Sequence, residues 1–297
     1  MRCMEEQQTR LCIKNILLAT DFSESSEATL PYALGLARRY GSTIFVAHVI
    51  SSEAEKAISP QAMRAGFDEV RYFAERAMAA FLGFASLGGI PHEALLERGS
   101  IPEAICEIVR NRQVDLVVIG RHGQKLRKFN IGSTAEEILR MVPCPVLIIG
   151  PEVTHTELAK GALARIVYVT DFSISSLDAL PYVVALAQDN EAQLMLVHVA
   201  EETTMGPFQY GNSRSVAFRK RLESLVPART GFLCESEFVV GYGDRAEGLV
   251  RVAANVNASL IVMGARGTPE EASARLPLLI GDQVVCRAHC PVLTVRG

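Results

Sequence analysis

The sequence has no apolar run that approaches the roughly 18 to 20 residues needed to cross a bilayer. Residues Met1 to Arg10 are polar and contain no secretory apolar region. Charge of neither sign is in excess, since 30 Lys and Arg stand against 33 Asp and Glu, a net charge of −3. Nucleic-acid binding depends on clustered cations. We therefore expect no nucleic-acid partner and no membrane partner, and a cytoplasmic location.

Cysteines are few and follow no framework spacing. The chain has seven, none of them in a C-x-x-C pair, and they are scattered among apolar positions. An odd, unpatterned set argues against a disulfide scaffold, and we expect reduced thiols packed as small hydrophobes. Cys286, His289 and Cys290 lie close in sequence, but no second ligand cluster is near them. A core and helix-end role is therefore favoured there over a metal site.

The sequence also lacks two common phosphate-binding motifs. It contains no Gly-Lys-Ser/Thr, which excludes a Walker A loop, and no G-x-G-x-x-G follows the first expected strand. Its composition is that of a packed soluble protein, with 49% hydrophobic and 21% charged residues. A length of 297 residues gives room for two domains.

An internal repeat decides the domain organisation. Ile16-Leu-Leu-Ala-Thr-Asp-Phe-Ser-Glu-Ser-Ser26 matches Ile166-Val-Tyr-Val-Thr-Asp-Phe-Ser-Ile-Ser-Ser176 at a constant offset of 150. Later, 115–120 matches 259–264 at an offset of 144, and Cys-Pro-Val-Leu at 144–147 recurs at 290–293, an offset of 146. We therefore predict a first copy at 1–150, a linker at 151–164 opened by Pro151, and a second copy at 165–297.

Within each copy, short apolar β-branched runs alternate with stretches of helical period, the pattern of β-α-β crossovers. Ser23 and Ser25, and likewise Ser173 and Ser175, are suitable N-caps for the first helix of each copy. The predicted fold class is α/β, with two tandem open parallel five-stranded sheets and helices on both faces. In the first copy we expect strands near 14–20, 43–50, 91–98, 115–120 and 145–150, and helices near 25–40, 61–84, 101–113 and 133–142.

One loop of the first copy is suited to phosphate. Gly120-Arg-His-Gly123 follows an expected strand, and Gly132-Ser133-Thr134 opens the next helix. Glycines let backbone N–H groups approach an anion, and a helix N-terminus offers unpaired donors and a positive dipole end. The alternative is that the glycines only turn the chain and Ser133 or Thr134 only caps the helix. A basic run in the same loop either offsets phosphate charge or forms a solvated face: Arg121, His122, Lys125, Arg127 and Lys128.

The chain resembles the universal stress protein (UspA) family in tandem form. The resemblance is carried by the Thr-Asp-Phe-Ser start, the His-Val second strand, the Gly-x2-Gly and Gly-Ser-Thr elements and the Cys-Pro-Val-Leu last strand. The family signature is Gly-x2-Gly-x9-Gly-Ser/Thr, and this chain has eight intervening residues instead of nine. Members with the signature bind ATP, so the resemblance implies an adenine-nucleotide α-hydrolase-like (Rossmann-like) fold and ATP, with or without Mg2+, as the ligand.

The resemblance also implies site residues. Those on the adenosine side would be Ala19, Thr20, Asp21 and Val49. Those around ribose and phosphates would be Ile119, Gly120, Gly123, Gly132, Ser133 and Thr134.

The second copy acts as an internal control. It keeps Gly264-Ala-Arg-Gly267, but Leu278, Leu279 and Ile280 stand opposite Gly132, Ser133 and Thr134, and the nearby Asp282 would place a carboxylate where phosphate belongs. We therefore expect no ATP binding in this copy. Asp171 nevertheless persists there, so Asp21 either contacts a ligand or only caps a turn. His48 and His198 recur equally, which favours packing at a strand end over catalysis.

The expected function is that of a cytoplasmic stress-response protein that binds ATP in its first copy and acts as a nucleotide-dependent binding module. One alternative is a weak ATPase or phosphoryl-transfer enzyme, although no spacing assigns a catalytic role to Asp21, His122 or Glu136. Another is a nucleotide-free dimerisation scaffold. By resemblance, the strands near 145–150 and 291–296 would pair the two copies as an internal pseudo-dimer, and two chains could form a homodimer. An amide-forming adenylation enzyme is not expected. Related ligase-type α/β folds carry a Ser-Gly-Gly-x-Asp-Ser loop after their first strand, and this loop is missing here.

Overall fold

The computed structural model describes residues 11–51, 63–84, 87–121, 132–154, 157–200, 213–226, 236–265 and 276–296. The first copy follows the predicted order of strands and helices. Its strands are β1 (Asn15–Ala19), β2 (Thr43–Ser51), β3 (His92–Gly99), β4 (Leu116–Gly120) and β5 (Val146–Ile149). Its helices are α1 (Glu24–Glu27), α2 (Leu30–Tyr40), α4 (Met63–Phe84), α5 (Ile101–Asn111) and α6 (Ser133–Met141).

The second copy repeats these elements. Its strands are β6 (Arg165–Val169), β7 (Gln193–Ala200), β8 (Ser236–Tyr242), β9 (Leu260–Ala265) and β10 (Val292–Arg296). Its helices are α7 (Ile174–Asp178), α8 (Leu180–Asp189), α9 (Ser213–Leu225), α10 (Arg245–Asn255) and α11 (Leu276–Arg287). The expected linker contains a short 3-10 turn, η1 (Leu158–Lys160).

The first helix of each copy differs from the expectation. The single helix predicted near 25–40 is interrupted, so that α1 ends at Glu27 and α2 begins at Leu30. Pro31 follows directly, and proline is tolerated in a first turn but disrupts a helix interior, so it favours a new start. Ser23, not Ser25, is the N-cap of α1, and Ser173 holds the same place before α7.

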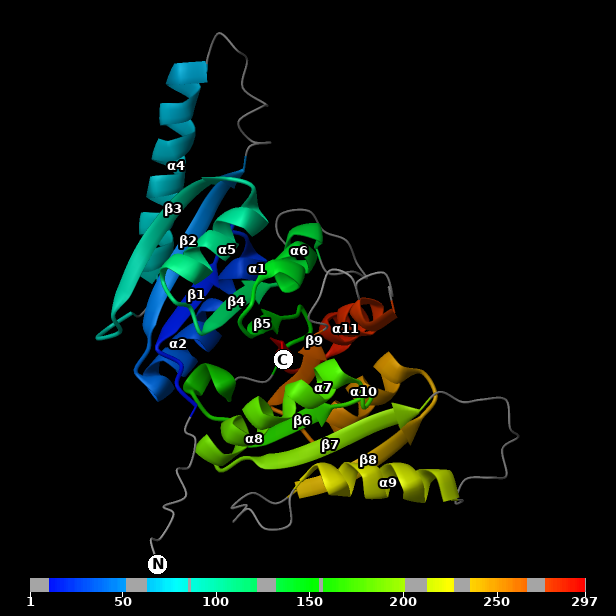
Figure 1. Ribbon diagram of the computed structural model, residues 1–297. Coiled ribbons are helices and arrows are strands. Elements are labelled where there is room, and N and C mark those ends of the chain that lie inside the picture. The colour runs from blue at the N-terminus through cyan, green and yellow to red at the C-terminus, as the bar shows by residue number, and fades with distance from the viewer. Residues whose placement is uncertain are drawn as a thin grey trace, which may run out of the picture.

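The two copies form one continuous ten-stranded sheet in the order β3-β2-β1-β4-β5-β10-β9-β6-β7-β8. Within each copy all neighbouring strands are parallel. β5 and β10 pair antiparallel, with Leu147 opposite Leu293, which is the pairing that the resemblance implied. Figure 1 shows the first copy above this joint and the second copy below it.

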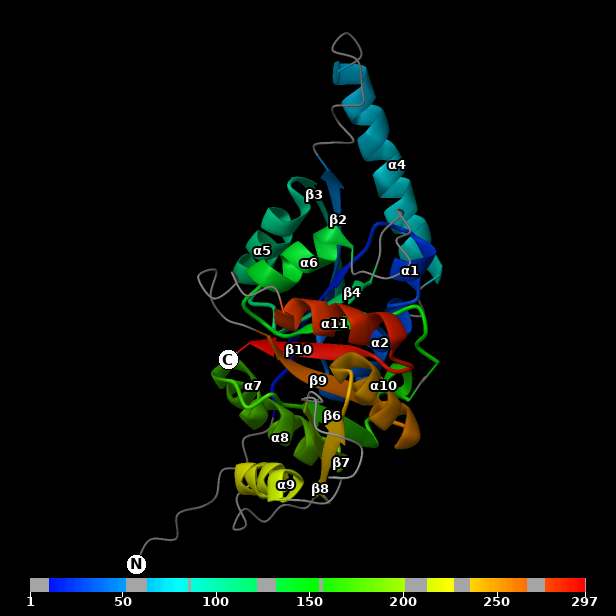
Figure 2. The same ribbon diagram turned by 90° about the vertical axis from the view of Figure 1, so that its right-hand side faces the viewer.

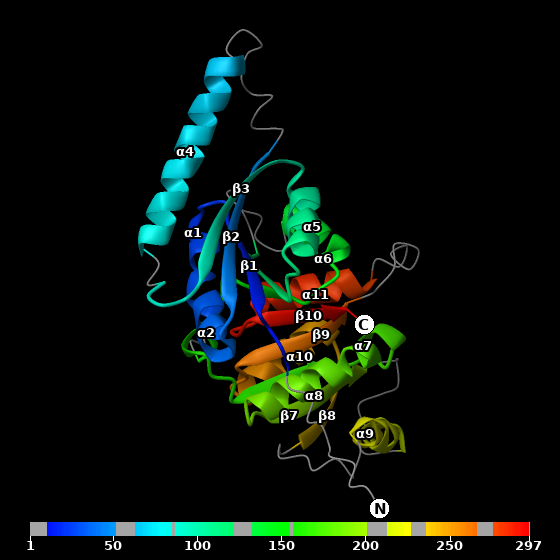
Figure 3. The ribbon, with the colours of Figure 1, turned by 60° about the vertical axis from the view of Figure 1, so that its left-hand side comes forward.

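Both faces of the sheet are covered by helices. In the first copy α2 and α4 lie on one face, and α5 and α6 lie on the other (Figure 3). Successive residues of β1 therefore enter different cores: Ile16 and Leu18 pack on the α2 side, and Leu17 packs on the α5 side. Burial on both faces explains why the strands read as continuous apolar runs instead of alternating ones.

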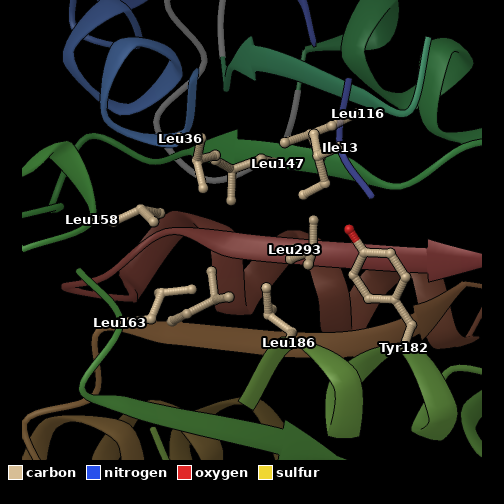
Figure 4. Close-up of a pocket in the computed structure, with 10 residues that line it drawn as sticks. Ile13, Leu36, Leu116, Leu147, Leu158, Leu163, Tyr182, Leu186 and Leu293 are labelled. Carbon is tan, nitrogen blue, oxygen red and sulfur yellow. The ribbon is translucent and has the colours of Figure 1, made fainter. Parts of the chain in front are cut away.

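Side chains from both copies meet in one apolar core at the joint. Leu147, Leu158, Leu293 and the half-buried Tyr182 belong to the same cluster. They help to line a cavity of about 20 Å³, which is little more than one water-sized sphere (Figure 4). Burial raises the pKa of Tyr182 above its ordinary value. The cavity is far too small and too apolar to hold a nucleotide, so it is not a candidate nucleotide site.

No helix among the described residues is both long enough and apolar enough to cross a membrane.

Candidate functional site

The chain turns sharply where β1 ends, and its own side chains close the turn. Thr20 is buried, its Oγ1 lies 3.0 Å from Ser26 Oγ, and it accepts a hydrogen bond from the Phe22 N–H (3.0 Å). Asp21 Oδ1 accepts from the backbone N–H of Ser23 (3.1 Å) and from its hydroxyl (2.6 Å). The Asp21 carboxylate therefore forms an Asx-type turn, which supports the capping role left open by the sequence.

His48 is packed against this turn. Its Nδ1 donates to the Thr20 carbonyl oxygen at 2.9 Å, and its ring stacks on Phe22 with centroids 4.4 Å apart. Phe22 has a φ of 60°, an uncommon value for a bulky residue. The histidine thus holds a strained turn in place, in agreement with the expected packing role at a strand end.

The end of β4 lies directly against the same turn. A Cβ on Gly120 would lie 2.8 Å from the Ser25 carbonyl oxygen and 2.9 Å from Ser25 Oγ. Only glycine allows this approach without a shift of the backbone. The fold therefore brings Gly120 to the same edge of the sheet as Thr20 and Asp21, which lie about a hundred residues earlier in the sequence.

The start of α6 is tied to the same place. The Gly132 N–H donates to the Arg121 carbonyl at 3.0 Å, and the Arg121 N–H donates to the Ile149 carbonyl at 3.1 Å. Gly132 is the extended N-cap of α6 and offers no side-chain cap, Ser133 is exposed and Thr134 is half-buried. The first N–H groups of a helix have no intrahelical partner and attract anions, so this end of α6 is chemically suited to phosphate oxygens.

The remaining expected site residues differ in what they can offer. Val49 and Ile119 are buried in the core beneath α5 and α6, so their side chains are occupied in packing. Ala19 is half-buried. Gly123 lies outside the described residues, as do His122, Lys125, Arg127 and Lys128 of the basic run.

Comparisons with known proteins agree on one family. The profile of the Universal stress protein family matches residues 13–150 and again 163–296. The chain belongs to the universal stress protein family. A universal stress protein of Synechocystis sp. is 25% identical over 96% of this chain and 100% of its own length. A putative universal stress protein of Staphylococcus epidermidis is 32% identical over 47% of this chain and 85% of its own length.

A solved structure gives the same fold. The crystal structure of a universal stress protein from Archaeoglobus fulgidus covers 97% of this chain and 98% of its own length, with a TM-score of 0.74 and 24% identity. The two profile matches make the present chain a tandem universal stress protein.

The second universal stress domain reproduces the turn of the first. Thr170 Oγ1 lies 2.9 Å from Ser176 Oγ, and Asp171 Oδ1 accepts from the Ser173 N–H (2.9 Å) and hydroxyl (2.5 Å). Burial acts to raise the pKa of Asp171, but these hydrogen bonds outweigh it and hold the pKa below its ordinary value. Burial lowers the pKa of His198, whose Nδ1 lies 2.8 Å from the Thr170 carbonyl.

The last helix is where the two domains differ. α6 begins at Ser133, whereas α11 begins at Leu276, three positions before Leu279, which stands opposite Ser133 in the repeat. The segment that replaces Gly-Ser-Thr therefore lies within a helix. Asp282 lies in α11, and its carboxyl is close enough to Glu136 and Arg140 of α6 to be affected by their charges. Burial and Glu136 raise the pKa of Asp282 to about 6.

Cys286 and His289, which lie close together in sequence near the C-terminus, contact different residues. Cys286 Sγ accepts from Arg121 Nη1 at 2.9 Å, and His289 Nδ1 lies 3.3 Å from the Glu152 carbonyl. No group of three metal-ligating side chains occurs in the part of the chain that the structure describes.

Two features of the site were not predicted from the sequence. Ser26 and Ser176 bond the threonine of each turn, and their recurrence at the same repeat position is a signal that could have found them. The contact between Arg121 and Cys286 joins residues 165 positions apart. No motif or spacing in the sequence indicates that contact.

Proposed function

We propose that this universal stress protein binds ATP, with or without Mg2+, in its first domain, and that its second domain does not bind ATP in the same manner. The nucleotide lies at the edge of the sheet where β1 and β4 end. Ala19, Thr20, Asp21 and Val49 line its adenosine side. Ile119, Gly120, Gly123, Gly132, Ser133 and Thr134 surround the ribose and phosphates.

One observation carries the proposal. α6 begins immediately after Gly132 at the edge of the sheet where β4 ends, with an exposed Ser133 and no side-chain cap. The carboxyl ends of parallel strands are the usual ligand edge of an open α/β sheet, and a helix N-terminus there attracts phosphate. In the second domain the corresponding positions are apolar and lie inside α11.

The protein then works as a cytoplasmic binding module whose nucleotide occupancy alters its contacts during stress. Hydrolysis is not part of the proposal, and Glu136 at the start of α6 pairs with Arg140. Thr20, Asp21 and His48 all bond the turn itself.

Isothermal titration of the full chain with Mg-ATP, after removal of co-purified nucleotide, tests the proposal. We expect one site per chain. Two sites would show that the second domain also binds, and none would favour a nucleotide-free scaffold.

A variant pair locates the site. Gly132→Val places a side chain in the phosphate path and is expected to abolish binding. Leu278→Val changes the matching position of the second domain and is expected to leave the titration unchanged. Unaltered ATP affinity in Gly132→Val would refute the site assignment.

A further inference from the structure

Arg121 is held in place at both of its backbone groups. Its N–H donates to Ile149 of β5, and its carbonyl accepts from Gly132, the residue that opens α6. Arg121 therefore belongs to the backbone that sets where α6 begins. Any movement of this residue would also move the first turn of that helix.

The side chain of Arg121 contacts the second domain. It is only 6% exposed, and its Nη1 donates to Cys286 Sγ of the second domain at 2.9 Å. Cys286 lies in the last turn of α11. Figure 2 shows α11 between β10 and α6. The Arg121 side chain thus joins the end of β4 in the first domain to the last helix of the second.

This contact leaves the charge of Arg121 poorly compensated. Thiol sulfur is a weak acceptor, and the negative end of the α11 dipole supplies only a partial charge. The buried Nε of Arg121 has no hydrogen-bond partner among the described residues. A buried cation without a full counter-charge is costly, whereas a phosphate oxygen would give it a charge-assisted hydrogen bond.

We propose that Arg121 binds a phosphate group of the ligand at the start of α6, and that Cys286 of the second domain is the positioning residue that holds the guanidinium there. The inference rests on the proposed ATP site in the first domain. It gives the second domain a role in that site: its last helix sets the affinity of the first domain for phosphate.

Titrations with ATP and with adenosine, which lacks phosphate, test this role. Arg121→Gln is expected to weaken ATP binding about 10- to 100-fold, as the loss of a charge-assisted hydrogen bond predicts, and to leave adenosine binding unchanged. Cys286→Ala is expected to weaken ATP binding about 3- to 10-fold, again without an effect on adenosine. Cys286→Ser keeps an acceptor at this position and is expected to restore most of the ATP affinity.

A matched control separates positioning from packing. Cys290 is another buried thiol of the same domain, 2% exposed, two residues before β10. Cys290→Ala removes a sulfur of equal size and is expected to leave the ratio of ATP to adenosine affinity unchanged. If Arg121→Gln fails to fold, Arg121→Lys keeps the charge and is expected to give an ATP affinity between those of wild type and Cys286→Ala.

The outcomes distinguish the two proposals. Wild type that binds no ATP would overturn both. ATP binding that is abolished by Gly132→Val but is unchanged in Arg121→Gln and Cys286→Ala would overturn this inference alone. Equal losses for ATP and adenosine would also overturn it, because they would indicate a purely structural contact.

Discussion

Gly120 and Ser25 approach so closely that a Cβ on the glycine would lie 2.8 Å from the serine carbonyl oxygen. The second domain has the same contact, since a Cβ on Gly264 would lie 2.4 Å from the Ser175 carbonyl. The glycine at the end of β4 and its counterpart in β9 are thus both required by packing, whether or not a phosphate loop follows. This requirement explains why Gly264 persists where Gly-Ser-Thr is missing.

Alanine at either glycine is expected to destabilise the fold. Gly120→Ala and Gly264→Ala force the turn away from the strand end and should each cost about 1 to 3 kcal/mol, measured by urea unfolding. Gly83→Ala is the control, because nothing lies within 4 Å of a Cβ at that position of α4. It should be neutral or slightly stabilising. Equal effects at Gly120 and Gly83 would contradict the packing account.

The paired aspartates allow the turn and ligand roles of Asp21 to be separated. Asp21→Ala and Asp171→Ala each remove an acceptor from a Ser N–H and hydroxyl, and each should cost about 1 kcal/mol of unfolding free energy. Thermal melts of the two variants check this equality. If Asp21→Ala lowers ATP affinity more than Asp171→Ala does, Asp21 contacts the ligand. If one variant loses much more stability than the other, the two turns are not equivalent.

Asp282 makes stability depend on pH. Its pKa is raised to about 6, above the unfolded value of about 3.9, so the folded state favours the protonated form. The contribution of this group to stability is therefore fully present below about pH 4 and is lost as pH rises through 6. Asp282→Asn has no carboxyl to ionise, so it should stabilise the protein at pH 7.5 by about 1 to 2 kcal/mol. This value is smaller than the full pKa shift would give, because the carboxyl is only half-buried and solvent screens its charge.

The stability difference between Asp282→Asn and wild type should shrink as the pH falls from 7.5 to 4. Unfolding midpoints measured across this range test the trend. A constant difference would show that the effect does not come from titration of Asp282.

The joint at β5 and β10 should make the two domains unfold together. Leu147 and Leu293 lie opposite each other and pack into a core drawn from both domains. Calorimetry is expected to show one transition for wild type. Leu293→Ala should cost about 2 to 5 kcal/mol and lower the midpoint of the whole transition. Two resolved transitions, or a shift confined to one of them, would contradict this coupling.

The sequence by itself determined the number of domains, the order of their elements and the fold class. The repeat that contains Asp21 and Asp171 defined two copies, and the alternation of short apolar runs with stretches of helical period predicted a parallel sheet with helices on both faces. It also indicated which helix start could bind phosphate, because Gly132 and Ser133 are helix-opening residues and Leu278 and Leu279 are not. These features follow from residue patterns along the chain, which can be recognised in a single sequence.

The tertiary structure decided what depends on contacts between distant residues. The approach of Gly120 to Ser25 and the bridge from Arg121 to Cys286 are set by how the helices pack on the sheet. Such contacts depend on the relative placement of elements far apart in the sequence, and no spacing within one element encodes that placement. For this reason the sequence indicated a basic run that includes Arg121, but it indicated neither the burial of this side chain nor its bond to the Cys286 thiol.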